Sequence, residues 1–255
     1  IMEAIHRRDV FEREHDFGAF QGAWLMPKDE RRQGVILYLH GGGYTCGSLE
    51  YAKGFAATLA DECGVRVFCA AYRLAPEHRY PAALDDALEA YRYLLKKGYP
   101  ARQILLCGES AGGGLCAAVC IRARDEGAVN VAFQMPLYPM LDDRDTASSR
   151  DNHGRVWNTR RNHLAWRPYL RGTDRASLSP YAAPARLTDF SGLPPAYSFV
   201  GDGEPFYAET VRYFEQLRAA GIPAELDVYH TDLHAFDMLE PSAALSGEAA
   251  GKFHA

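Results

Sequence analysis

The chain has 255 residues, of which 47% are hydrophobic, and its formal net charge is -5 at pH 7. This length and composition predict a single domain, with one sizeable core, over residues 1–255. A net acidic chain lacks the basic surface that nucleic acid requires, and the apolar runs are too short to span a membrane. We therefore expect neither nucleic acid nor a membrane as a partner.

The six cysteines lack the spacing of a disulfide framework, and most stand among apolar residues: Cys46, Cys63, Cys69, Cys107, Cys116 and Cys120. With no signal-peptide pattern at the start of the chain, they favour a reducing, cytoplasmic compartment. Two of them, Cys116 and Cys120, share a helix face, but two thiols without a third ligand are typical of a core. We expect no metal and no organic cofactor.

The first 18 residues are charged and mixed, which predicts a surface helix or an arm, a remnant of a cap, outside the core. Residues 20–26 are predicted to form a strand that ends at Pro27. A polar loop over residues 28–33 follows, and residues 35–39 have the continuous apolar run of a buried strand.

A glycine-rich stretch, His40-Gly41-Gly42-Gly43-Tyr44, comes directly after this buried strand. One interpretation is a flexible turn. The alternative is an oxyanion hole, because three glycines leave main-chain N–H groups free of covering side chains and able to point into a cavity. The second interpretation gains weight from the serine motif further along the chain.

Helices and strands alternate after the glycine stretch. Residues 51–62 and 81–97 are predicted helices, the second with a proline in its first turn, and residues 65–71 are a predicted strand between them. The loop 72–81 contains two prolines. This alternation is typical of a mostly parallel sheet with helices on both faces, which is the α/β class of fold.

The pattern Gly108-x-Ser110-x-Gly112 lies between an apolar strand ending at Leu106 and an Ala/Leu/Val/Ile-rich helix over residues 111–123. Such a pattern also arises by chance, so its weight comes from this strand-turn-helix context, which is that of a nucleophile elbow. Ser110 is then expected to project from the carboxyl edge of the sheet, at the start of a helix whose amides favour negative charge.

The alternation breaks over residues 141–184, where arginines interleave with tryptophan and tyrosine. In an acidic chain we expect this stretch to be a partly helical, cap-like excursion that forms one wall of a substrate cleft. A strand is predicted at 131–137, before this excursion. After it the regular pattern resumes, with strands predicted at 195–200 and 224–229 and helices at 205–219 and 235–254, the last interrupted at Pro241.

A serine nucleophile needs a histidine base, and that histidine needs a carboxylate, each on a loop after a strand. His234 follows the last predicted strand and is favoured over His230, which lies nearer the strand end. For the acid, the loop after the penultimate strand offers Asp202 and Glu204, and Asp232 is a third candidate.

Five motifs together resemble the bacterial hormone-sensitive-lipase family of α/β-hydrolase carboxylesterases: His40-Gly41-Gly42-Gly43-Tyr44, Tyr72-Arg73-Leu74-Ala75-Pro76-Glu77, Pro81-Ala82-Ala83-Leu84-Asp85-Asp86, Gly108-Glu109-Ser110-Ala111-Gly112-Gly113 and Leu233-His234-Ala235-Phe236. The resemblance covers residues 34–240. It implies an α/β-hydrolase fold. It also implies these roles: Ser110 as nucleophile, His234 as base, and the amides of Gly41, Gly42 and Ala111 as the oxyanion hole.

The chain departs from the family at the acid, because Glu204-Pro205 stands where an Asp-Pro pair is usual. Alignment favours Glu204 as the acid, with Asp202 as the alternative. The family's N-terminal helical cap is expected to be abbreviated or missing in this sequence.

The resemblance implies a serine carboxylesterase that acts on small-molecule esters with acetyl to butyryl groups. An amidase or formamidase, an acyltransferase, and a non-catalytic ligand-binding protein remain alternatives, and a homodimer is compatible with the sequence.

Overall fold

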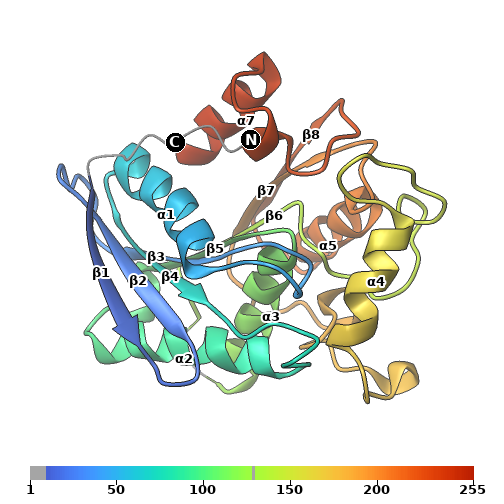
Figure 1. Ribbon diagram of the computed structural model, residues 1–255, viewed down its shortest axis with the longest axis horizontal. Helices are drawn as coiled ribbons and strands as arrows, with labels where there is room; N and C mark the ends of the chain where they lie inside the picture. The colour runs from blue at the N-terminus through green and yellow to red at the C-terminus, as the bar shows by residue number, and fades with distance from the viewer. Residues whose placement is uncertain (1–9, 128–129) are drawn as a thin grey trace.

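An eight-stranded sheet in the order β1-β2-β4-β3-β5-β6-β7-β8 forms the centre of the computed structural model, which describes residues 10–127 and 130–255 (Figure 1). From β3 onward the neighbouring strands are parallel, whereas β2 runs antiparallel to both β1 and β4. The strands are β1 (Val10–Asp16), β2 (Gln21–Pro27), β3 (Val35–Leu39), β4 (Arg66–Ala71), β5 (Ile104–Glu109), β6 (Phe133–Leu137), β7 (Ala196–Gly201) and β8 (Ala224–Tyr229).

Helices cover both faces of this sheet, which confirms the predicted fold class. The helices are α1 (Leu49–Cys63), α2 (Ala82–Lys96), α3 (Ala111–Asp125), α4 (Thr159–Tyr169), α5 (Tyr207–Ala219), α6 (Phe236–Leu239) and α7 (Ala244–His254), with short 3-10 turns at Ala101–Gln103, Arg175–Ser177 and Pro184–Arg186. One core contains residues of α2, α3 and α5, and the other contains residues of α1, α6 and α7. Because both faces are buried, β3 is apolar at every position: Leu37 and Leu39 enter the first core, and Ile36 and Tyr38 the second.

Local signals explain where the helices begin and end. Ser48 precedes α1, and its side chain accepts a hydrogen bond from the Tyr51 amide at 3.1 Å, while Gly64 ends the helix in the left-handed conformation. Pro81 precedes α2, and Pro241 falls between α6 and α7, as the sequence predicted.

The N-terminal prediction needs correction in the part that the structure describes. Residues 1–9 of the predicted arm lie outside the described residues, and residues 10–16 form strand β1 at the edge of the sheet, not a helix or an arm. Most side chains of β1 are exposed, so its sequence lacks the alternation of a half-buried strand. Pairing along β2, from Val10 opposite Pro27 to Asp16 opposite Gln21, holds β1 in place.

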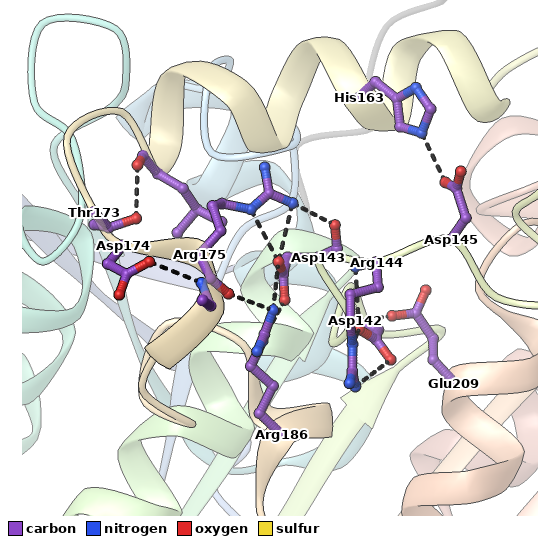
Figure 2. A network of polar contacts seen from close by, with 12 residues as sticks. Asp142, Asp143, Arg144, Asp145, His163, Thr173, Asp174, Arg175, Arg186 and Glu209 are labelled. Atoms are coloured by element: carbon purple, nitrogen blue, oxygen red, sulfur yellow. Dashed lines mark hydrogen bonds and ion pairs between the residues drawn. The ribbon is translucent and has the colours of Figure 1, made fainter.

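The excursion between β6 and β7 carries α4 and lies at one side of the molecule (Figure 1). The buried carboxylate of Asp143 anchors it, with Arg175 at 2.9 Å and Arg186 at 2.6 Å (Figure 2). Glu209 of α5 accepts hydrogen bonds from the amides of Leu141 and Asp142. The start of the excursion is therefore fastened to the helix that follows β7.

Among residues 10–127 and 130–255, no helix is long and apolar enough to cross a membrane. Within the same ranges, no cluster of three or more histidine, cysteine, aspartate or glutamate side chains has the arrangement of a metal site.

Candidate active site

Ser110 occupies the turn between β5 and α3 with φ 57° and ψ -117°, a backbone conformation that residues other than glycine rarely adopt. The turn is tight: a β-carbon on Gly108 would overlap the Gly112 carbonyl, and one on Gly112 would overlap the Leu39 carbonyl. The Ser110 amide donates to the Leu137 carbonyl at 3.0 Å, which fixes the turn against β6. The predicted strand-turn-helix geometry is thus present, with Ser110 at the head of α3.

His234 lies on the loop between β8 and α6, and its imidazole connects Ser110 to a carboxylate. Its Nε2 is 3.0 Å from Ser110 Oγ, and its Nδ1 is 3.0 Å from Glu204 Oε1. The rings of Tyr138 and Phe206 pack edge-on against the imidazole, each with its centroid 5.1 Å away. These contacts bury the imidazole and hold its plane.

Glu204 follows β7 and is fully buried. Burial raises the pKa of its carboxyl group, and the nearby His234 opposes that rise. The three alternative residues lie elsewhere. Asp202 pairs with His230 at the surface, with Oδ2 and Nδ1 2.9 Å apart, and Asp232 is exposed. Of the candidates that the sequence left open, the structure brings Glu204 and His234 to Ser110, and it places Asp202 and His230 in a separate pair.

The glycine loop runs from the end of β3 past the elbow. Gly42 and Gly43 have φ values of 121° and 61°, and the Gly42 carbonyl accepts hydrogen bonds from the amides of Thr45 and Cys46. The amide of Ala111 is at the first position of α3, where helix geometry supplies no acceptor. The Gly41 backbone lies against the Glu109 carboxylate, because a β-carbon on Gly41 would overlap Glu109 Oε2.

His40 braces this loop. Its Nδ1 is 2.7 Å from the Gly41 carbonyl oxygen, and its ring is stacked on Tyr72 with centroids 4.3 Å apart. Burial lowers the pKa of His40 to about 4, so its ring is neutral at pH 7. The Tyr72 hydroxyl donates to the His40 carbonyl, which ties the loop after β4 to the glycine loop.

The excursion contributes Trp157 to the surroundings of the imidazole. The centroid of its ring lies 6.2 Å from that of His234, and a β-carbon on Gly43 would overlap the same ring. The sequence predicts that this stretch forms one wall of the substrate cleft. It does not identify the side chain, because no local pattern shows which aromatic residue points toward the site.

A group of polar side chains near the imidazole was not predicted from the sequence. Glu109 is buried and accepts hydrogen bonds from two tyrosine hydroxyls, Tyr38 at 2.8 Å and Tyr51 at 3.3 Å. Asp237, which lies in α6 three residues after His234, accepts a hydrogen bond from the Tyr138 hydroxyl at 2.9 Å. Only the position of Glu109 beside the serine was visible in the sequence.

Comparisons with known proteins find relatives that share the fold. Residues 36–238 match the family model of the alpha/beta hydrolase fold. Esterase LipI of Mycobacterium tuberculosis is 34% identical over 214 residues, which are 82% of this chain and 67% of the relative. Carboxylesterase NlhH of the same species is 35% identical over 231 residues, or 86% of this chain and 71% of the relative.

Solved structures are similar over nearly the whole chain. A bacterial heroin esterase has a TM-score of 0.88 at 31% identity, covering 99% of this chain and 84% of that one. An esterase from the bacterial hormone-sensitive lipase family also has a TM-score of 0.88 at 31% identity, covering 96% of this chain and 83% of that one.

Proposed function

Because the chain belongs to the hormone-sensitive-lipase type of carboxylic ester hydrolases within the α/β-hydrolase fold family, we propose that it hydrolyses short-chain acyl esters through an acyl-enzyme formed on Ser110. The observation that supports this most is the line of contacts from Ser110 Oγ through His234 to Glu204, each 3.0 Å long. A hydroxyl, an imidazole and a carboxylate at these distances meet the geometric requirement for a serine nucleophile with its base and acid.

In the first half-reaction, His234 Nε2 takes the proton of Ser110 Oγ as that oxygen attacks the carbonyl carbon of the ester. The negative charge on the carbonyl oxygen is stabilised by the amides of Gly42 and Ala111. Gly41 belongs to the same loop, and its backbone packs against the Glu109 carboxylate. When the tetrahedral intermediate collapses, His234 donates the proton to the leaving alcohol, and the acyl group stays on Ser110.

In the second half-reaction, water replaces the alcohol. His234 takes a proton from the water as it attacks the acyl carbonyl, and it returns this proton to Ser110 as the carboxylic acid leaves. Glu204 accepts the Nδ1–H bond throughout, which keeps the proton off Nε2 in the resting site and stabilises the imidazolium when it forms. No step of this sequence calls for a metal or an organic cofactor.

A series of p-nitrophenyl esters from acetate to decanoate tests this function, with the Ser110→Ala variant as the control for the site. We expect the highest kcat/KM on acetate to butyrate and the loss of hydrolysis in the variant at an unchanged melting temperature. Matched amides, and an added alcohol acceptor, separate an esterase from an amidase and from an acyltransferase. Full activity in Ser110→Ala would refute the assignment of the nucleophile.

A further inference from the structure

Glu109 connects the serine turn to the glycine loop. It directly precedes Ser110, and its Oε1 accepts the hydroxyls of Tyr38 and Tyr51 at 2.8 and 3.3 Å. Its other oxygen, Oε2, lies against the Gly41 backbone, where a β-carbon would overlap it. Both tyrosine hydroxyls donate to the carboxylate, so its ionised form is the one that these contacts fit.

Asp237 is the second carboxylate of this region. It comes from α6, is partly buried, and accepts the Tyr138 hydroxyl at 2.9 Å, while the Tyr138 ring packs edge-on against His234. The charge of Asp237 raises the pKa of Glu109, and both carboxylates interact electrostatically with His234. A groove of about 530 Å³ between α1 and the α6–α7 segment is lined by Tyr51 and Asp237, which gives the pair a route for proton exchange with solvent.

The groups around Glu109 come from every element that packs against it. Tyr38 belongs to β3, Cys107 to β5 and Tyr51 to α1, and the others are on loops or on α6. None of them is a lysine or an arginine: Tyr38, Tyr51, Tyr72, Cys107, Tyr138, His234 and Asp237. With no lysine or arginine among these neighbours, the two carboxylates compete for the ionised state.

We propose that Glu109 and Asp237 work as a pair of positioning residues, in which ionised Glu109 holds the oxyanion loop through Gly41 and the charge of Asp237 opposes that ionisation. The pair thereby adds a second proton-dependent step to the acid side of the esterase pH profile, beside the protonation of His234. This inference rests on the proposed function, because it concerns the loop that stabilises the ester oxyanion.

The direction of the pH effect follows from the causes of each pKa shift. Burial raises the pKa of Glu109 to about 7; the bonds from Gly41 and Tyr38 oppose the rise, and Asp237 adds to it. Burial likewise raises the pKa of Asp237 to about 6. As the pH falls through about 7, Glu109 gains a proton, loses an acceptor position, and releases its hold on the loop. Activity is therefore complete above this range and declines below it.

The test is kcat/KM for p-nitrophenyl acetate from pH 5 to 9 in a pH-stat. For the wild type we expect log kcat/KM to fall with a limiting acid slope of two, because Glu109 and His234 must both be unprotonated. Glu109→Gln removes one ionisation, so its slope should be one. Its maximal rate should fall by less than the roughly 10²- to 10³-fold that follows loss of a direct oxyanion donor.

Two further variants should move the acid limb of the pH profile in opposite directions. They keep the test decisive if Glu109→Gln fails to fold. Asp237→Asn should move the acid limb to lower pH by about half a unit to one unit, because a negative charge is lost. Tyr38→Phe should move the limb to higher pH, because the ionised form loses a donor. The control is Glu240→Gln, a surface carboxylate that pairs with exposed Arg155, and it should leave the limb in place.

The outcomes separate this inference from the proposed function. If the wild type shows no Ser110-dependent hydrolysis at pH 8.5, the proposed function fails. An active esterase with a slope of one in both the wild type and Glu109→Gln would overturn the inference alone. The inference would also be overturned if the acid limb moved in the same direction in Asp237→Asn and Tyr38→Phe. It would likewise be overturned if Asp237→Asn moved the acid limb by the same amount in the Glu109→Gln enzyme as in the wild type.

Discussion

Glutamine in place of Glu204 tests the role of the carboxylate in the triad. The Glu204 side chain is fully buried, and its Oε1 lies 3.0 Å from Nδ1 of His234, which is itself only 5% exposed. Glutamine has nearly the same shape but can turn its NH₂ group toward Nδ1. The imidazole would then carry its proton on Nε2, facing Ser110, where it can no longer accept the serine proton.

The size of the effect follows from that change of tautomer. The same carboxylate-to-amide change in a serine protease triad lowers kcat by roughly 10⁴-fold, which corresponds to about 5 kcal/mol of transition-state stabilisation. We expect a loss of roughly 10³- to 10⁴-fold in kcat for Glu204→Gln. KM should change little, because Glu204 lies behind the imidazole and does not face the ester.

The assay is hydrolysis of p-nitrophenyl butyrate at pH 8, with Asp202→Asn as the matched control. Asp202 stands two residues earlier, carries the same charge, and pairs with His230 at the surface. We expect this control to retain at least half of the wild-type kcat. A loss in Asp202→Asn as large as that in Glu204→Gln, or a nearly active Glu204→Gln enzyme, would refute the assignment of the acid.

Three other changes probe the scaffold. Gly112→Ala should lower the free energy of unfolding by about 3 kcal/mol in urea titrations, because its β-carbon would overlap the Leu39 carbonyl. Asp143→Ala should lower it by about 2 to 3 kcal/mol, less than for a fully buried pair because Arg175 is half exposed. Arg186 and Arg175 lower the pKa of Asp143 in the folded protein. The stability that Asp143 contributes is therefore fully present above its unfolded pKa of about 4. This stability is lost as the pH falls through the lower pKa of the folded state. Trp157→Ala should raise the rate of hydrolysis of the octanoate ester relative to the butyrate ester by about tenfold. An unchanged ratio would show that Trp157 does not contact the acyl chain.

The elbow and the glycine loop could be predicted because their causes are local. Gly108 and Gly112 are required by backbone contacts within one turn, and the buried strand and apolar helix on either side are read directly from the order of residues. His234 followed from its place after the last strand. In each of these cases a short stretch of chain determines the conformation and the position of the side chain.

The remaining features depend on contacts between segments far apart in the chain. The choice between Glu204 and Asp202 depends on which side chain turns into the core; residue type and loop position admit both, and only the family alignment favoured Glu204. Strand β1 exposes Phe11 and its charged neighbours, so only its pairing with β2 identifies it as a strand. The contact of Trp157 with His234, and that of Asp237 with Tyr138, likewise arise only when the sheet has assembled.

The most direct measurement is the site of covalent modification by a fluorophosphonate probe, followed by mass spectrometry of the intact protein and of its peptides. We expect one adduct per chain, located on Ser110, with labelling slowed strongly in His234→Ala and lost in Ser110→Ala. An adduct on another residue, or equal labelling rates in the wild type and in His234→Ala, would contradict a hydroxyl activated by this imidazole.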